Sequence, residues 1–264
     1  MTKDSPIGIF DSGIGGLTIL KKIKEILPRE NIIYYGDWKN NPYSEKSEEE
    51  IRNFSREITD FLLRNNCKAI VVGCSIFSTA SLEYLKELNP NIIIVGMIDG
   101  GVNSAILESE NKKIAVMGAE FVINSNIYER KIRELDSDII LYQIPCKKLC
   151  GMLEKGWENF PDRLEILEGY LKNIPRDVDT LILGGTHYPI IKEDIQKFFS
   201  KKIVDSSVES VIELFKELGE KNLLREGLKK GRVEFYINGD REKFRKIAEE
   251  LLESKDRINI FSIY

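Results

Sequence analysis

Two apolar segments of strand length, each followed by a glycine and a polar turn, constrain the fold of this chain most. Residues 69–78 read AIVVGCSIFS and residues 180–189 read TLILGGTHYP. Apolar runs of this length are typical of strands buried on both faces of a parallel sheet. Open α/β sheets carry their chemistry at the carboxyl ends of such strands, so Cys74 and the single histidine, His187, are the first functional candidates.

Strands and helices alternate along the chain, which predicts an α/β fold. We expect strands at residues 7–10, 32–35, 70–72, 92–95, 114–117, 139–144, 180–183, 202–204 and 233–237. Helices are expected at 17–27, 47–65, 81–88, 103–109, 124–135, 208–218 and 241–252, with a mostly helical region at 147–171. The position of strand 7–10 relative to strand 70–72 resembles that of strand 114–117 relative to strand 181–183. This repeated relationship indicates two similar lobes.

The expected first lobe consists of residues 1–98 and about 207–264, and the second consists of residues from about 99 to 206. Each lobe is predicted to be a mainly parallel sheet flanked by helices.

Size and composition narrow the functional classes. The chain has 264 residues, of which 42% are hydrophobic and 31% charged, and its formal net charge is -4. The chain has no long run of residues of one charge, so neither a nucleic-acid partner nor a membrane-surface partner is predicted. No apolar segment reaches the roughly 18 residues of a membrane span. The first ten residues lack an apolar signal core, so a cytoplasmic location is expected.

The four cysteines are too few for a disulfide scaffold in a chain of this length. Cys146 and Cys150 are spaced like neighbours on one face of a helix, but no second Cys or His pair completes a metal site, and no metal is predicted. These two and Cys67 are interpreted as small apolar side chains that only pack in the core. Cys74 stands between a strand and a helix start, which predicts backbone donors that lower the pKa of its thiol.

The glycine-rich turn DSGIGG at residues 11–16 first suggests a dinucleotide loop, with Asp37 as the ribose acceptor. Thr18 stands where that loop needs its third glycine, and Asp11 would set a carboxylate beside a pyrophosphate. An Asp and a Ser at the carboxyl end of a strand fit a small ligand with an amino group better. His187, at the end of the matching strand, is placed for proton transfer.

Together these motifs resemble the cofactor-independent glutamate racemases of the aspartate/glutamate racemase superfamily. The similarity runs almost from end to end, and FDSGIGGLT at residues 10–18 and THYP at residues 186–189 are its most specific parts. It implies a two-lobed α/β fold that binds glutamate, or a similar small acidic amino acid, between the lobes. It also implies a cofactor-free mechanism in which one cysteine removes the α-proton and another reprotonates the opposite face. D-Glutamate supply for peptidoglycan is the implied role, and a homodimer is left open.

By position, the resemblance assigns Cys74 as the first thiol, Asp11 as its carboxylate neighbour, and Glu154 and His187 as groups that assist the second thiol. The substrate-binding positions that it matches are Asp11, Ser12, Pro42, Tyr43, Ser44, Ser75, Ile76, Thr186 and His187.

The departures from the family pattern fall in the site. The family's Gly-Cys-Thr-His is Gly184-Gly185-Thr186-His187 here, and its Cys-Asn-Thr is Cys74-Ser75-Ile76. Because glycine cannot carry a proton, most racemase activity should be lost unless His187 or a held water substitutes for the missing thiol. Three alternatives follow: a glutamate-racemase-type isomerase with Cys74 as the surviving acid–base group, a one-thiol superfamily enzyme with another substrate, or a binding protein without turnover.

Overall fold

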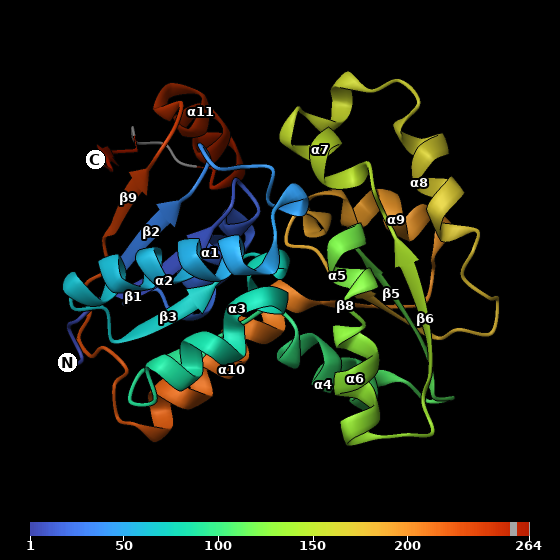
Figure 1. Ribbon diagram of the computed structural model, residues 1–264, viewed down its shortest axis with the longest axis horizontal. Coiled ribbons are helices and arrows are strands. Elements are labelled where there is room, and N and C mark those ends of the chain that lie inside the picture. The colour runs from blue at the N-terminus through green and yellow to red at the C-terminus, as the bar shows by residue number, and fades with distance from the viewer. Residues whose placement is uncertain (254–257, 264) are drawn as a thin grey trace.

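Two parallel β-sheets organise the computed structural model, which describes residues 1–253 and 258–263 (Figure 1). The first sheet has the strand order β10-β9-β2-β1-β3-β4 and the second has the order β6-β5-β7-β8. Every pair of neighbouring strands is parallel. The predicted α/β class, with two parallel sheets flanked by helices, is confirmed. Residues 254–257 and 264 of the predicted first lobe lie outside the described residues.

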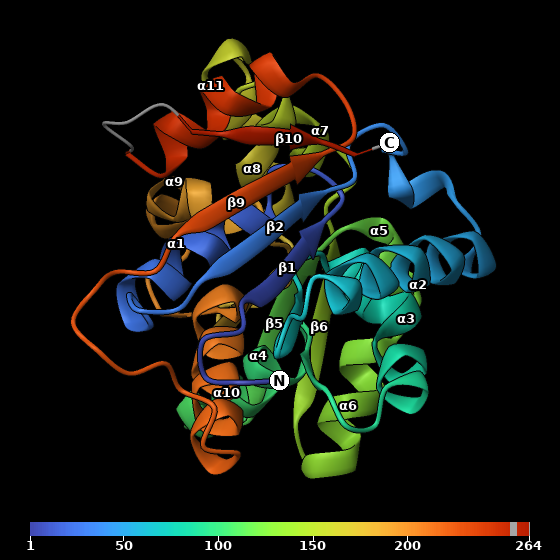
Figure 2. The ribbon, with the colours of Figure 1, turned by 90° about the vertical axis from the view of Figure 1, so that its left-hand side faces the viewer.

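Helices cover both faces of the first sheet (Figure 2). Its strands are β1 (Ile7–Asp11), β2 (Ile32–Gly36), β3 (Ala69–Val72), β4 (Ile93–Val95), β9 (Val233–Ile237) and β10 (Ile260–Ser262). Because successive side chains of a strand point to opposite faces, β1 contributes Ile9 to one core and Phe10 to the other. The Ile9 core includes side chains of α1 (Gly16–Ile26), α10 (Ser206–Glu220) and α11 (Arg241–Leu251). The Phe10 core includes side chains of α2 (Glu48–Arg64) and α3 (Ser75–Leu88).

The second sheet is built in the same way. Its strands are β5 (Lys113–Gly118), β6 (Ile140–Pro145), β7 (Thr180–Leu183) and β8 (Lys202–Asp205). One core packs against α7 (Leu149–Glu154), α8 (Arg163–Leu171) and α9 (Lys192–Phe198). The other packs against α4 (Asp99–Glu108), α5 (Glu120–Asn124) and α6 (Ile127–Leu135). Helix α10 lies against both α1 and α4, and so joins the helices of the two sheets.

The predicted correspondence between the sheets is confirmed in the strand pairing. Strand β1 pairs with β3 in the first sheet, and β5 pairs with β7 in the second. Cys74 follows the last residue of β3 by two positions, and Gly185 follows the last residue of β7 by two positions. The thiol and the glycine therefore occupy matching places at the carboxyl ends of matching strands.

Several predicted helix bounds are wrong. Helix α3 begins at Ser75 and α4 begins at Asp99, each earlier than expected, because the first turn of α3, SIFS, continues the apolar run of β3 and that of α4, DGGV, holds two glycines. The helix expected at 124–135 begins only at Ile127, after Asn126 in a left-handed conformation with φ of 56°, and the separate helix α5 ends at Asn124. Cys146 lies in the loop after β6 and not on a helix. Within the described residues, no helix is long and apolar enough to cross a membrane.

Candidate active site

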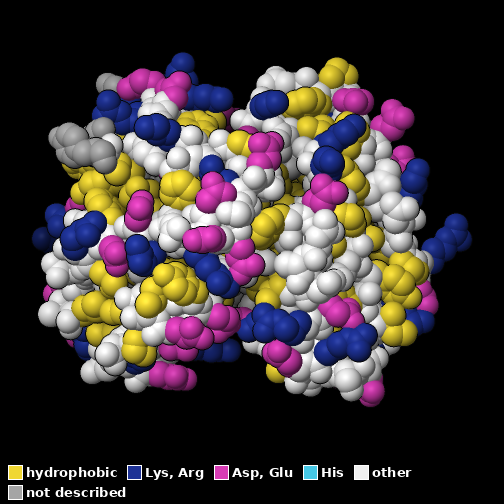
Figure 3. All heavy atoms as spheres, viewed as in Figure 1, with side chains coloured by type: hydrophobic (Ala, Val, Ile, Leu, Met, Phe, Trp, Pro, Cys, Tyr) yellow, Lys and Arg dark blue, Asp and Glu magenta, His cyan; other side chains and the backbone are white. Residues whose placement is uncertain are grey.

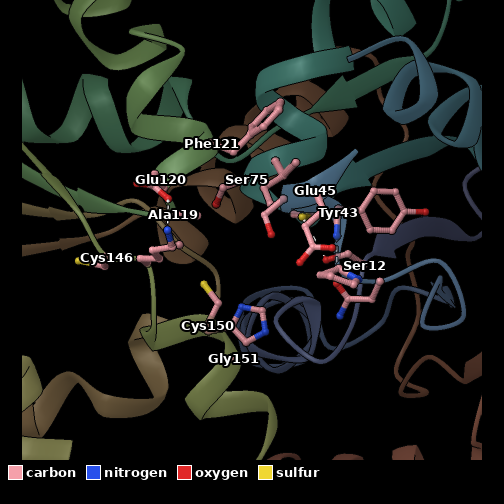
Figure 4. Close-up of a pocket in the computed structure, with 18 of the residues that line it drawn as sticks. Ser12, Tyr43, Glu45, Ser75, Ala119, Glu120, Phe121, Cys146, Cys150 and Gly151 are labelled. Carbon is pink, nitrogen blue, oxygen red and sulfur yellow. Dashed lines mark hydrogen bonds and ion pairs between the residues drawn. The ribbon is translucent and has the colours of Figure 1, made fainter. Parts of the chain in front are cut away.

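A pocket of about 880 Å³ opens where the loops that follow the strands of the two sheets meet. Figure 3 shows the furrow between the two halves of the surface, and Figure 4 shows the pocket itself. Most of the predicted site residues line it: Ser12, Pro42, Tyr43, Ser44, Cys74, Ser75, Ile76, Glu154, Gly185, Thr186 and His187. Asp11 is fully buried and is not among the lining residues, so its direct contact with a substrate stays a prediction.

The thiol of Cys74 lies at the amino end of α3, where this residue is the N-cap. Burial raises its pKa to about 12, and the charge of Asp11 acts in the same direction. A contact of 3.3 Å with the Ser12 hydroxyl oxygen and the backbone N–H groups of Ile76 and Phe77 act against that rise. The expected donors are present, but the expectation of a lowered pKa is wrong because burial outweighs them. Cys74 is therefore protonated at neutral pH in the free protein.

Asp11 is the carboxylate whose charge raises the pKa of this thiol. One carboxylate oxygen, Oδ2, accepts a hydrogen bond from the backbone N–H of Gly13 at 2.7 Å. Burial raises the pKa of Asp11 to about 6, although the charge of His187 and the Gly13 hydrogen bond oppose the rise. A carboxyl group with this pKa changes its charge close to neutral pH, which suits a site that moves protons.

His187, which is buried, and Glu154, which is partly exposed, form a pair on the second sheet's side of the pocket. The imidazole Nε2 lies 3.3 Å from Glu154 Oε1. Burial lowers the pKa of His187, but hydrogen bonds with Cys150 and Glu154 and the charges of both groups outweigh burial and hold this pKa well above its usual value. Asn41, in the loop after β2, donates to both Glu154 oxygens at 3.1 Å and so ties the pair to the first sheet.

The glycine-rich turn after β1 is filled by side chains that follow the second sheet. A β-carbon on Gly15 would stand 2.2 Å from the Thr186 hydroxyl oxygen, and one on Gly13 would stand 2.6 Å from Glu154 Oε1. The Thr18 hydroxyl donates to the backbone carbonyl of Thr186 at 3.0 Å. These glycines therefore allow a close approach between the two halves, and the turn leaves no space for a pyrophosphate.

Asp37 forms hydrogen bonds with side chains of the protein and does not serve as an acceptor for a ribose. It is buried, and its carboxylate accepts hydrogen bonds from Tyr43, Asn40 and Asn238. The Tyr43 hydroxyl is fixed by this contact while the residue lines the pocket. Asp37 thus orients a residue of the site and does not itself reach the pocket wall.

Sequence reasoning missed two cysteines of the pocket. Cys146 and Cys150 both line it, whereas the sequence interpretation made them apolar filler. Cys146 is almost fully buried, but Cys150 is partly exposed on α7. One signal in the sequence could have found it: Cys150 precedes Glu154 by four residues, which places both on one face of a helix.

The hydroxyl of Ser75 is a further group that could bind a ligand. Ser75 is 5% exposed and lines the pocket, but its hydroxyl has no hydrogen-bond partner. Buried polar groups are normally paired, so an unpaired one at a pocket wall is a position at which a ligand binds. The described residues contain no group of three or more His, Cys, Asp or Glu side chains that could hold a metal ion.

Comparison with known proteins identifies the family. The profile of the family described as Asp/Glu/Hydantoin racemase matches residues 7–213. The chain belongs to this racemase family. A glutamate racemase of Fusobacterium nucleatum is 42% identical over 251 residues, which cover 95% of each chain. Among solved structures, this family member is similar to a glutamate racemase isoform from Bacillus anthracis, with a TM-score of 0.94, 34% identity and coverage of 99% and 98% of the two chains. A Francisella tularensis glutamate racemase in complex with D-glutamate has a TM-score of 0.90, 33% identity and the same coverage.

Proposed function

We propose that this protein is a glutamate racemase that interconverts L- and D-glutamate by transfer of the α-proton. The observation that carries the proposal is the thiol of Cys74, which lines the same pocket as the His187–Glu154 pair. Groups that can exchange protons thus come from both sheets and meet around one space. No cofactor takes part in the proposed reaction, because side chains supply each proton transfer.

The substrate's carboxylates would be held by neutral donors. Glu45, Glu48, Glu120 and Glu154 line the pocket, and Lys147 is the one Lys or Arg among its described lining residues. Lys147 lies 3.7 Å from Glu120 and is already paired. The amino end of α3 and the unpaired hydroxyl of Ser75 are the donors best placed for an anion, since backbone N–H groups and the helix dipole both favour negative charge there.

Substrate binding would also prepare Cys74 for proton removal. The charge of Asp11 raises the pKa of the thiol in the free protein. The ammonium group of a bound amino acid would offset that charge and favour the thiolate. The reactive form of Cys74 would therefore arise mainly when the pocket is occupied.

We infer two lobes, residues 1–98 with about 207–264 and residues from about 99 to 206, with the substrate between them. Supply of D-glutamate for peptidoglycan in the cytoplasm follows from the proposed activity. The sequence leaves a homodimer open, and sedimentation analysis of the purified protein would test it.

Proton NMR in heavy water tests the proposed activity. L-Glutamate and D-glutamate are incubated separately with the protein, and loss of the α-proton signal is followed together with optical rotation. Exchange accompanied by racemisation is expected from either enantiomer.

Two other results would favour the alternatives that Gly185 and Ile76 leave open. Exchange of one enantiomer without racemisation would indicate a one-thiol enzyme in which Cys74 works on one face only. No exchange with either enantiomer would overturn the proposal and favour another substrate, or a binding role that does not include turnover.

A further inference from the structure

Racemisation needs a side chain that can donate or accept a proton on each face of the substrate. Removal of the α-proton leaves a carbanion, and inversion requires that the new proton arrive from the opposite face. Cys74 supplies one group, but Gly185, at the matching place after β7, supplies none. The space beside Gly185 is also closed, because a β-carbon there would stand 2.9 Å from the ring of Tyr188. The second proton-transferring group is therefore not the side chain of residue 185.

Cys150 lies where such a group is required. It is the second residue of α7, it lines the pocket, and it is partly exposed. Figure 4 shows Cys150 on one side of the pocket and Ser12 on the other, and Ser12 is the residue whose hydroxyl lies 3.3 Å from the Cys74 sulfur. The two thiols are thus placed on opposite sides of the space that would hold a substrate.

Neighbouring side chains fix Cys150 and give it a proton partner. Cys150 lies close enough to His187 to raise the pKa of the imidazole, whose Nε2 lies 3.3 Å from Glu154 Oε1. Its thiol lies 3.9 Å from the hydroxyl of Tyr188, the same side chain that closes the space at Gly185. An imidazole beside a thiol can exchange a proton with it between turnovers. Gly185, which lacks a thiol, and Cys150, which has one, therefore both lie beside Tyr188, and Cys150 also interacts with His187.

The other two cysteines fit this role less well. Cys146 is 1% exposed, and its thiol lies 3.4 Å from the backbone carbonyl of Ile144. Cys67 is fully buried in the core of the first sheet and does not line the pocket. Of these three cysteines, Cys150 is the one that lines the pocket, interacts with His187 and is partly exposed.

We propose that Cys150 is the second acid–base residue of this site, acting on the face of the substrate opposite to Cys74. The thiolate of one cysteine takes the α-proton, so that an S–H bond forms while the C–H electron pair stays on the α-carbon. The thiol of the other cysteine then donates its proton to that pair from the opposite face and becomes a thiolate. The reverse reaction exchanges the two roles. This inference rests on the proposed racemase function.

The test compares Cys150→Ala and Cys150→Ser with the wild-type protein, using both glutamate enantiomers in heavy water. We expect both variants to lose racemisation by a factor of about 100 or more, which is the usual contribution of a positioned acid–base group. Exchange of the α-proton of one enantiomer, the one that Cys74 deprotonates, should persist in both. Cys67→Ala, which changes the cysteine outside the pocket, is the matched control and should racemise like the wild type.

Three results would overturn the inference, and they can be told apart. Racemisation by both Cys150 variants at the wild-type rate, or its loss in Cys146→Ala instead, would remove Cys150 from the mechanism while leaving the proposed function intact. A wild-type protein that turns over neither enantiomer would remove both proposals. If Cys150→Ala fails to fold by circular dichroism, the nearly isosteric Cys150→Ser decides. Folded variants that lose exchange of both enantiomers would show that Cys150 does not serve one face.

Discussion

The ring of Tyr188 lies so close to Gly185 that a β-carbon on this glycine would stand 2.9 Å from Cε2 and 3.1 Å from Cζ of the ring. Tyr188 is fully buried, and its hydroxyl lies 3.9 Å from the thiol of Cys150. The position at which the resemblance places a second thiol is therefore closed by an aromatic side chain, and that side chain contacts a thiol from a different helix.

Replacing Gly185 by Cys should not restore a racemase of the usual pattern. The new β-carbon requires Tyr188 to move, and overpacking of this kind costs about 1–3 kcal/mol of unfolding free energy. We expect Gly185→Cys to be destabilised by this amount in urea titrations and to racemise glutamate no faster than the wild type. Gly185→Ala adds the same β-carbon without a thiol and is the matched control. A tenfold gain in kcat that appears only in the Cys variant would show instead that the wild-type site lacks a second proton group.

The contact between His187 and Glu154 should be visible in the titration of the imidazole. His187 is the single histidine of the chain, so a tag-free protein gives one imidazole proton signal. Hydrogen bonds and charges of Cys150 and Glu154 outweigh burial and raise the pKa of His187. Glu154→Gln should therefore lower this pKa, and the proton NMR titration should shift toward lower pH.

Glu120→Gln controls for the loss of a pocket carboxylate, because Glu120 lies beside Lys147 and not beside His187. If Glu154→Gln and Glu120→Gln left the imidazole titration equally unchanged, the Glu154 contact would not be what holds the proton on His187.

Asp11 should make stability depend on pH. Its pKa in the folded protein is about 6, above the ordinary value of 3.8. A raised pKa means that folding favours the protonated form, so the stabilisation is complete below pH 4 and is lost as pH rises through 6. The shift corresponds to about 3 kcal/mol. The unfolding free energy of Asp11→Asn, relative to the wild type, should rise by about this amount between pH 4 and pH 7.

Denaturant titrations at several pH values measure that change, and any constant cost of the asparagine cancels from it. Asp60→Asn, on an exposed position of α2, controls for the removal of one negative charge. A difference between Asp11→Asn and the wild type that stays constant from pH 4 to pH 7 would contradict the prediction.

Much of the fold is predictable from the sequence because the strands are apolar and end in glycine and polar turns. Strands β7 and β9 have the expected bounds, and the pairing of β1 with β3 and β5 with β7 follows from the repeated pattern. The three-residue strand β10 and the short helix α9 were not predicted, since so few residues carry no detectable periodicity. The starts of α3 and α4 were placed too late, because the first turn of α3 continues the apolar run of β3 and that of α4 holds two glycines.

Site residues that lie within a recognised motif could be predicted from the sequence. Residues whose role depends on contacts in the folded protein could not. The resemblance placed Cys74, Thr186 and His187, and all three line the pocket. It could not place Cys150, because no family motif includes that position and the spacing to Cys146 suggested a helix face instead. It could not give the direction of the Cys74 pKa shift either, since that depends on how far burial outweighs the donors around the thiol.

A buried ion pair at the end of the first sheet opposite the pocket should control stability. Lys68 Nζ lies 2.5 Å from Glu30 Oε2, with both side chains almost fully buried, and also donates to the carbonyls of Lys3 and Leu223. Lys68→Met would leave the Glu30 carboxylate buried without its partner, which costs about 3–5 kcal/mol. Urea titration measures the loss, and the exposed Lys229→Met is the control.

Removing the remaining charge should recover much of that loss. In the double variant Lys68→Met with Glu30→Gln, no unpaired charge is buried, and Gln can still accept from the backbone N–H of Arg225, which lies 2.8 Å from Glu30 Oε1. Because replacing both partners of a buried pair is often nearly neutral, the double variant should be more stable than Lys68→Met alone. An equal loss in both would mean that the lysine acts through its hydrogen bonds to Lys3 and Leu223, which join the chain start and the segment after α10, and not through the charge of Glu30.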